Sequence, residues 1–279
     1  MNNFIKNCLE QLNKKNFQYP DVEMRALLNK TSKTKKEIIF SNFDKKQINM
    51  QMFKKAFRRR LKFEPLAKIF NEKYFWKNKF YVNNDVLDPR PETELIIETV
   101  KKHIKNQNKK INILDLGTGS GCLAISLAQE YENSKIVATD ISKKALKVAI
   151  KNSKLITKPK QIEFIHCNWI KDLNFFDVIV SNPPYLNIDQ YNNLPKEISS
   201  YEPKIALYAG KDGLDCYRKI ANILTIISKS NSLSFIEIGH NQKNQCVNLF
   251  GEFGMNCIDI IKDYQSYDRI LVLKKINKR

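Results

Sequence analysis

The sequence predicts an α/β protein with a mostly parallel β-sheet and a small N-terminal α-helical domain. From about residue 111 onward, apolar runs of strand length alternate with stretches of helical periodicity, which is the pattern of a parallel sheet with helical crossovers. Residues 1–75 differ, because they contain no glycine and carry apolar residues at helical spacing, such as Ile5, Leu9 and Leu12.

Three segments follow from this pattern. We expect a helical domain over residues 1–73, a hairpin linker over residues 74–87 and the α/β domain over residues 88–279. In the linker, the aromatic runs Tyr-Phe-Trp and Phe-Tyr-Val are separated by polar turn residues, which is typical of short paired strands. A chain of 279 residues is long enough for one ordinary domain with a small partner domain.

The charge of the chain is strongly positive and unevenly distributed. Lys and Arg number 48 against 29 Asp and Glu, a net charge of +19, and residues 1–75 hold 18 basic and 7 acidic residues. An acidic partner is one interpretation, and the lysine-rich codon usage of an AT-rich genome is the other. The basic run between Lys54 and Lys62 is accordingly either a solvated helix face or a docking surface.

Several classes of protein are excluded by what the sequence lacks. Hydrophobic residues make up 42% and charged residues 28%, so the chain is neither disordered nor fibrous. The six cysteines form no Cys-x-x-Cys pair, and we expect no metal site and no disulfide, as in a reducing cytoplasm. The first thirty residues and the rest of the chain lack the apolar runs of a signal peptide or a transmembrane helix.

A glycine-rich loop follows the first strand of the α/β region. An apolar run over residues 111–116 leads into Gly-Thr-Gly-Ser-Gly at residues 117–121, and a helical pattern comes next. Glycines allow positive φ and a close approach of ligand to backbone. Asp140 ends the next strand, 23 residues after Gly117, where a carboxylate can accept hydrogen bonds from both hydroxyls of a ribose. The pair indicates an adenosine-containing cofactor.

The spacing of the glycines separates two kinds of cofactor. Dinucleotide enzymes use Gly-x-Gly-x-x-Gly in front of a pyrophosphate, whereas this loop is Gly-x-Gly-x-Gly and is preceded by Asp115. An acidic residue suits a cationic ligand better than a phosphate. S-adenosylmethionine carries a sulfonium and an ammonium group and no phosphate, so it fits this loop, with a purely structural turn as the alternative.

A second motif, Asn-Pro-Pro-Tyr at residues 182–185, directly follows a buried strand pattern at residues 176–181. The two prolines fix the backbone and offer no N–H, so Asn182 is held rigidly just past the end of the strand. Its side-chain oxygen and the nearby carbonyls are acceptors, and Tyr185 is a flat surface for stacking. Such a pocket suits a planar NH₂ group, which is a poor nucleophile and needs orientation to react.

Together these elements resemble class I S-adenosylmethionine-dependent methyltransferases, whose fold is Rossmann-like with a mostly parallel seven-stranded sheet. Within that class they resemble the HemK/PrmC family, which methylates a glutamine of peptide chain release factors. The resemblance covers nearly the whole chain. Beyond the two motifs it rests on Arg-Arg at 59–60 with Glu-Pro-Leu-Ala at 64–67, Tyr-Phe-Trp at 74–76, Pro-Arg-Pro-Glu-Thr-Glu at 89–94, Tyr-Glu-Pro at 201–203, Gly-Lys-Asp-Gly-Leu at 210–214, and Lys-Asp-Tyr at 262–264 before Asp-Arg at 268–269.

The resemblance implies methylation of the glutamine amide nitrogen (N5) in the Gly-Gly-Gln loop of release factors, with S-adenosylmethionine as cofactor. By position it implies cofactor binding by Gly117, Thr118, Gly119, Ser120, Gly121, Asp140, Asn168, Trp169 and Asn182. It implies substrate binding by Asn182, Pro183, Pro184 and Tyr185, with Asn182, Pro183 and Tyr185 catalytic. Asn168 stands where the family usually has Asp near the adenine amine, and its oxygen can still accept from that group.

Other functions remain open from the sequence. The same motif serves enzymes that methylate a ribosomal-protein glutamine or N6 of adenine in nucleic acid, and the net charge of +19 favours the latter. A non-catalytic RNA-binding protein is a further alternative, against which the intact Asn-Pro-Pro-Tyr run argues. The leading expectation is a cytoplasmic monomer that needs neither nucleic acid nor membrane, and whose helical domain helps to engage the release factor.

Overall fold

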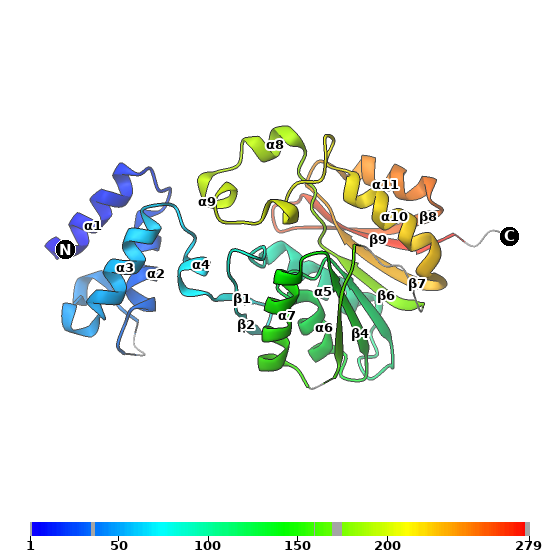
Figure 1. Ribbon diagram of the computed structural model, residues 1–279, viewed down its shortest axis with the longest axis horizontal. Coiled ribbons are helices and arrows are strands. Elements are labelled where there is room, and N and C mark those ends of the chain that lie inside the picture. Colours follow the sequence, from blue (N-terminus) through cyan, green and yellow to red (C-terminus); the bar gives the residue numbers. More distant parts are fainter. Residues whose placement is uncertain (1, 35–36, 159, 169–174, 277–279) are drawn as a thin grey trace. The chain divides into compact units, whose positions relative to one another are not determined.

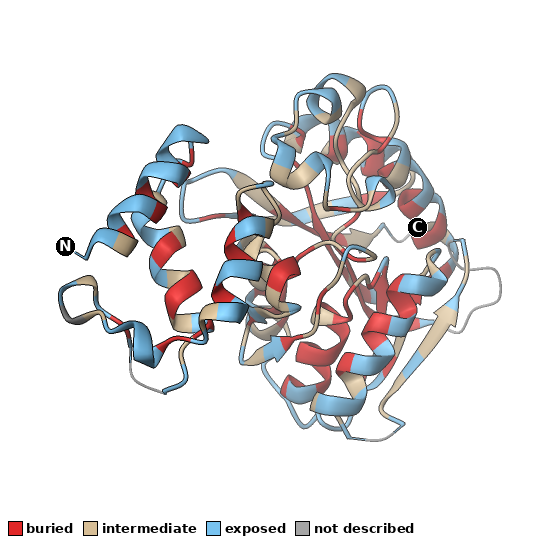
Figure 2. Ribbon diagram, turned by 60° about the vertical axis from the view of Figure 1, so that its left-hand side comes forward, coloured by how far each residue is buried: buried red, intermediate tan, exposed pale blue. Residues whose placement is uncertain are grey.

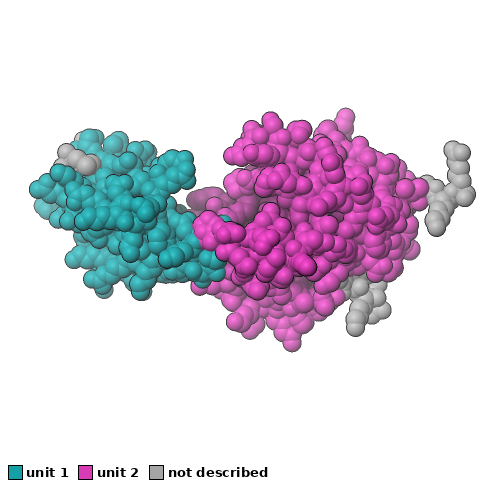
Figure 3. All heavy atoms as spheres, turned by 90° about the horizontal axis from the view of Figure 1, so that it is seen from above, with its two compact units in different colours: residues 1–71, 196–201 teal, residues 72–195, 202–279 magenta. Residues whose placement is uncertain are grey.

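The computed structural model describes residues 2–34, 37–158, 160–168 and 175–276 (Figure 1). The chain divides into two compact units, one of residues 1–71 with 196–201 and one of residues 72–195 with 202–279 (Figure 3). Within the described residues, no helix has the length and apolar character needed to cross a membrane.

The smaller unit is built from helices packed on one apolar core. Its α-helices are α1 (Asn3–Lys14), α2 (Pro20–Lys30), α3 (Met50–Arg60), α4 (Leu66–Phe70) and α9 (Lys196–Ser199), with single 3₁₀ turns η1 (Phe40–Asn42) and η2 (Lys45–Gln47). The side chains of Asn2 and Asn49 cap α1 and α3 by accepting backbone N–H groups of the first turn. Residues such as Leu12, Leu27 and Phe53 are buried in the core.

The predicted basic run on α3 divides into two kinds of residue. Arg60 is buried, donates to Glu23 at 2.7 Å and to Glu197 at 2.6 Å, and lies over the ring of Phe17. Arg59 pairs with Glu64. The remaining residues of the run are exposed: Lys54, Lys55, Arg58 and Lys62. Two of the six cations therefore hold the unit together, and four face solvent.

The larger unit confirms the predicted fold class, a seven-stranded and mostly parallel α/β sheet. Its strand order is β5-β4-β3-β6-β7-β9-β8, with β9 antiparallel to both of its neighbours. The strands are β3 (Asn112–Leu116), β4 (Lys135–Asp140), β5 (Ile162–His166), β6 (Phe176–Ser181), β7 (Ser228–Glu237), β8 (Met255–Lys262) and β9 (Asp268–Lys275). Helices join β3 to β4, β4 to β5 and β6 to β7, as the alternating pattern predicted.

Helices cover both faces of this sheet (Figure 1). On one face lie α5 (Glu94–His103), α6 (Cys122–Glu130) and α7 (Lys143–Ile156), and on the other lie α10 (Asp215–Ile227) and α11 (Lys243–Glu252). Short elements η3 (Pro91–Thr93), α8 (Ile188–Asn192) and η4 (Lys204–Ala206) lie in the connections. The buried residues concentrate on the strands and on the helix faces turned toward them (Figure 2).

The aromatic hairpin consists of β1 (Lys73–Phe75) and β2 (Asn78–Phe80), paired antiparallel. Phe75 and Phe80 are buried in the core of the larger unit, and Trp76 Nε1 donates to Glu130 Oε1 at 2.8 Å. The hairpin is therefore a packed part of the α/β unit. The helical unit in turn includes residues 196–201, which lie far along the chain from the rest of it.

Asn152 of α7 ties the segment after the hairpin to the glycine-rich loop. Its side chain is fully buried, accepts from the Tyr81 N–H at 2.8 Å, and donates to the carbonyls of Tyr81 at 3.0 Å and Ser120 at 2.9 Å. One buried amide thus bonds to three backbone groups from two loops.

We predict that Asn152→Ala lowers the free energy of unfolding by about 3 kcal/mol, because each buried polar group left without a partner costs about 1–3 kcal/mol. Urea denaturation measures this change. Asn133→Ala is the matched control, since Asn133 is exposed and donates to the Asn108 carbonyl, and its cost is expected to stay within about 0.5 kcal/mol. Equal midpoints for the two variants would refute the structural role of Asn152.

Candidate active site

The site lies at the carboxyl edge of the central parallel strands. Leu116, the last residue of β3, is paired with Thr139 of β4 on one side and with Ser181 of β6 on the other. The residues that follow these three are Gly117, Asp140 and Asn182. The register therefore brings the glycine loop, the predicted ribose carboxylate and the Asn-Pro-Pro-Tyr run to one edge.

A cavity of about 380 Å³ opens at this edge, within the usual range of small-molecule sites. Of the residues expected to bind cofactor or substrate, those that line it are Gly117, Thr118, Gly119, Ser120, Asp140, Asn168, Asn182 and Pro184. Gly121, Pro183 and Tyr185 do not line it. Trp169 lies outside the described residues.

The glycine loop has the backbone that only glycine adopts easily. Gly117 has φ 75° and Gly119 has φ 56°, and an added Cβ at either position would meet no atom within 4 Å, so the loop backbone faces open space. A ligand can therefore lie directly against it. Gly121 has another role, because a Cβ there would come within 3.1 Å of Ala149 on α7, so this glycine allows close helix packing.

Asp140 organises the loop and also lines the cavity. Its Oδ2 accepts from the Gly119 N–H at 2.9 Å, and its Oδ1 accepts from the Ser142 N–H at 2.8 Å. Burial raises the pKa of this carboxyl, against the opposing effect of those two hydrogen bonds. Each oxygen retains a further lone pair, so the group can hold the loop and still accept from ribose hydroxyls.

Asp115 supports the loop from beneath and does not line the cavity. It is 1% exposed, and its Oδ2 accepts from Thr118 Oγ1 at 2.6 Å and from the Ala124 N–H at 3.2 Å. Burial raises the pKa of Asp115 to about 7. Its contacts within the protein thus fix the conformation of the loop, and the acidic residue that the sequence associates with a cationic ligand lies behind the cavity lining.

The Asn-Pro-Pro-Tyr run is fixed by partners from distant parts of the chain. Asn182 Nδ2 donates to Thr93 Oγ1 at 2.8 Å, and Thr93 Oγ1 in turn donates to Glu237 Oε2 at 2.7 Å. Pro183 is buried. The carbonyl of Tyr185 accepts from Gln242 Nε2 at 3.0 Å, and burial raises the pKa of the Tyr185 hydroxyl to about 12, so this phenol is neutral.

Two further segments line the cavity, one before the first strand of the large sheet and one after the Asn-Pro-Pro-Tyr run. Residues of the segments 85–90 and 203–210 contribute to its lining. Glu202 joins the two segments, because its carboxylate accepts from the Asp88 N–H and from Arg90 Nη2, each at 3.3 Å. The Pro-Arg-Pro and Glu-Pro runs of the sequence therefore meet at the cavity.

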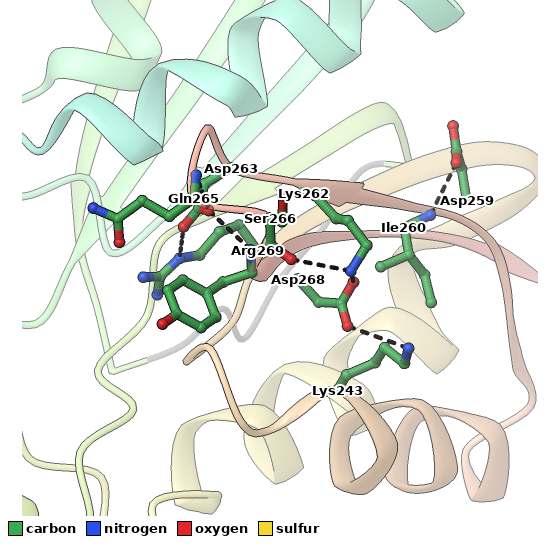
Figure 4. Close-up of polar contacts among 10 residues, drawn as sticks. Lys243, Asp259, Ile260, Lys262, Asp263, Gln265, Ser266, Asp268 and Arg269 are labelled. Carbon is green, nitrogen blue, oxygen red and sulfur yellow. Dashed lines mark hydrogen bonds and ion pairs between the residues drawn. The ribbon is translucent and has the colours of Figure 1, made fainter.

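The C-terminal motif is a braced turn between β8 and β9 (Figure 4). Asp263 Oδ1 accepts from the N–H groups of Gln265 and Tyr267 at 2.9 Å, and its Oδ2 accepts from Arg269 Nε at 2.8 Å. Arg269 is close enough to Tyr185 to affect the pKa of its hydroxyl. The turn therefore holds a cation whose charge reaches the hydroxyl of Tyr185.

Sequence reasoning did not single out Thr93 and Glu237, which form a hydrogen-bonded series with Asn182. Thr93 belongs to the Arg-Pro-Glu-Thr-Glu run, which carries the family resemblance but indicates no role for an individual residue. Glu237 ends the buried second half of β7 directly after Phe235 and Ile236, and an acidic residue at that point was an available signal.

The parallel sheet, the glycine loop with its acidic partner and the Asn-Pro-Pro-Tyr run define a class I S-adenosylmethionine-dependent methyltransferase. The Methyltransferase small domain family matches residues 84–198. The catalytic domain of hMettl16, solved with an RNA hairpin, shares this fold with a TM-score of 0.52 at 13% identity, covering 70% of this chain and 73% of that one. The cofactor is S-adenosylmethionine, and the open glycine loop and Asp140 fit it.

The chain belongs to the release factor glutamine methyltransferase family. It is 34% identical to the protein of that name from Buchnera aphidicola, covering 97% of this chain and 99% of that protein. It is 38% identical to the one from Thermodesulfovibrio yellowstonii, covering 80% of each. It is also 36% identical to a bifunctional methyltransferase of Rickettsia typhi over 98% of this chain, and it spans 57% of the length of that relative.

We predict that Asp140→Ala weakens S-adenosylmethionine binding by about 2–3 kcal/mol, because hydrogen bonds to a charged acceptor are lost. Isothermal titration calorimetry measures the affinity. Asp177→Ala is the control, since Asp177 is the second residue of β6, near the amino end of that strand, and accepts from the Asn112 N–H. An unchanged dissociation constant for the Asp140 variant would show that this carboxylate does not hold the ribose.

Proposed function

We propose that the chain transfers the methyl group of S-adenosylmethionine to the side-chain amide nitrogen of the glutamine in the Gly-Gly-Gln loop of peptide chain release factors. The observation that carries this proposal is which of the two polar side-chain atoms of Asn182 is already hydrogen-bonded. Its side chain lines the cavity beside the cofactor loop, and its Nδ2 is engaged by Thr93. Its Oδ1 therefore remains as the acceptor for an NH₂ group.

The chemistry needs orientation more than it needs a base. A bound S-adenosylmethionine supplies an electrophilic methyl group on sulfur. The lone pair of an amide nitrogen is delocalised, so the enzyme must fix both N–H bonds for the lone pair to point along the reaction axis. Acceptors such as Asn182 Oδ1 also stabilise the positive charge that develops on nitrogen. Tyr185 is neutral and half-buried, so it is not suited to take the proton of the amide. Because it does not line the cavity, its ring stacks on the planar amide only where the substrate extends past the lining toward the Asn-Pro-Pro-Tyr run.

The family relationship supports the choice of substrate, because relatives named release factor glutamine methyltransferase align with most of this chain. We further propose that the helical unit docks the release factor, that the residues cited for cofactor and substrate act in those roles, and that the protein works as a cytoplasmic monomer. The six cysteines are free thiols, which suits a reducing compartment.

A second candidate is methylation of N6 of adenine in nucleic acid, which the net charge of +19 favours. The two functions are separated by incubating the purified chain with S-adenosylmethionine carrying a labelled methyl group and with either release factor, total RNA or duplex DNA. We expect label in the release factor, and in its Gly-Gly-Gln peptide after proteolysis. Label in nucleic acid alone would overturn the proposal.

We predict that Asn182→Ala lowers kcat/KM for release factor by about 10² or more, comparable with the loss of one preorganised electrostatic contact. The affinity for S-adenosylmethionine is expected to change much less, because the cofactor loop is intact. Tyr185→Ala should mainly raise KM by loosening the stacked amide. Steady-state kinetics decide the matter, and an Asn182→Ala enzyme with the parent kcat/KM removes this residue from the mechanism.

The docking role of the helical unit predicts an effect on KM alone. Reversing the exposed charges with Lys54→Glu, Lys55→Glu and Arg58→Glu together should raise KM for release factor roughly fivefold at low salt and leave kcat unchanged. The matched control reverses three exposed lysines of the larger unit, Lys105, Lys109 and Lys110. Equal KM values for both triple variants would argue against docking through α3.

A further inference from the structure

We propose that Glu237 is a positioning residue for methyl transfer, which in its ionised form acts through Thr93 to turn the side-chain oxygen of Asn182 toward the substrate amide. This inference rests on the proposed function, because it assigns Asn182 the task of accepting from the NH₂ group of the substrate. It adds a residue that does not line the cavity, and a protonation state on which the reaction depends.

The three side chains form one hydrogen-bonded chain. The distance from Asn182 Nδ2 to Thr93 Oγ1 is 2.8 Å, and the distance from Thr93 Oγ1 to Glu237 Oε2 is 2.7 Å. Thr93 and Glu237 are each 2% exposed, so water does not compete for these bonds. Thr93 and Asn182 line the cavity, whereas Glu237 lies behind them. Glu237 therefore reaches the substrate only through its two partners.

The number of hydrogens available in this hydrogen-bonded series fixes the orientation of the Asn182 side-chain amide. An ionised carboxylate can only accept, so the single hydroxyl hydrogen of Thr93 goes to Glu237. The Thr93 oxygen is then available only as an acceptor, and Asn182 must present its NH₂ group to it. The amide oxygen of Asn182 consequently faces away from Thr93 and is left to accept from the substrate.

A neutral Glu237 removes this constraint. A protonated carboxyl can donate to Thr93, whose hydrogen is then free to bond to the oxygen of Asn182. With the hydrogen bonds in these reversed directions, Asn182 presents its own NH₂ group to the NH₂ group of the substrate, so that two donors face each other. The ionised form alone thus requires the productive orientation, and it keeps the acceptor in place without reorganisation during the reaction.

The surroundings of Glu237 place its titration in an accessible range. Burial raises the pKa of Glu237 to about 7, Glu92 raises it as well, and the hydrogen bond from Thr93 and the cations Arg269 and Arg90 oppose the increase. Other titratable groups also interact electrostatically with this carboxylate, namely Tyr185, Tyr217 and Cys122. Since the productive form is the ionised one, activity is expected above pH 7 and is expected to fall as the pH drops below it.

The end of β7 is held independently of this carboxylate, which makes the role testable. The hydroxyl of Tyr217 donates to the backbone carbonyl of Glu237 at 3.3 Å, and Ile238 N–H donates to the carbonyl of Arg269 at 2.8 Å. Replacing Glu237 by the isosteric Gln changes the charge and leaves these backbone bonds in place.

The test compares pH profiles of kcat for the parent enzyme and its variants on release factor. For Glu237→Gln we expect kcat at pH 8 to fall roughly tenfold to hundredfold. The decrease in activity below about pH 7, which we call the acidic limb of the profile, should be abolished. The affinity for S-adenosylmethionine should stay within about twofold of the parent. Thr93→Val should lose activity similarly, and Thr93→Ser, which keeps the hydroxyl, should restore most of it.

Two buried residues outside the site provide matched controls. Thr99 donates to the Leu95 carbonyl within α5, and Glu130 accepts from Trp76, so Thr99→Val and Glu130→Gln make the same chemical changes without touching Asn182. Both should keep the acidic limb. A Glu237→Gln enzyme with the parent kcat and the parent pH profile would overturn the inference.

A second readout does not require turnover. In NMR spectra of protein with isotope-labelled asparagine, the side-chain amide signals of Asn182, identified by their loss in Asn182→Ala, should shift with a midpoint near pH 7. The shift should be absent in Glu237→Gln. Signals that titrate equally in both proteins would contradict the role of Glu237, whereas a parent enzyme that methylates no release factor would count against the proposed function alone.

Discussion

The parallel pairing at the end of β3 is the constraint on which the site depends. Leu116 is in register with Thr139 and Ser181, so the chain leaves three adjacent strands at the same level and delivers a glycine loop, a carboxylate and an amide to one edge. Side chains alternate between the two faces of a strand, so a slip of one residue would send the buried side chains of β3 to the wrong face and separate these groups. The two apolar cores, one on each face of the sheet, hold this register.

Buried polar groups then set the fine geometry behind that edge. Asp115 braces the glycine loop, Asn152 ties it to the segment after the hairpin, and Glu237 holds Thr93 against Asn182. Burying carboxyl groups is unfavourable, and it raises the pKa of both Asp115 and Glu237 to about 7. In return these groups fix orientations that solvent-exposed side chains, free to change rotamer, would not maintain.

Local pattern was sufficient to predict the parts of the molecule that are contiguous in sequence. The alternation of strands and helices, the glycine loop and the Asn-Pro-Pro-Tyr run lie where they were expected. What could not be predicted depends on partners far apart in the chain. Glu237 meets Thr93 across 144 positions, and the buried Arg60 pairs with Glu197 across 137 positions, which makes an apparent surface cation a structural one.

A crystal structure of the chain with S-adenosylhomocysteine and a peptide containing Gly-Gly-Gln tests this arrangement most directly. We expect the ribose hydroxyls on Asp140, the glutamine amide within hydrogen-bonding distance of Asn182 Oδ1, and Asn182 Nδ2 on Thr93. A glutamine bound away from the Asn-Pro-Pro-Tyr run, or a ribose that does not contact Asp140, would contradict the proposal that cofactor and amide meet at the carboxyl edge of β3, β4 and β6.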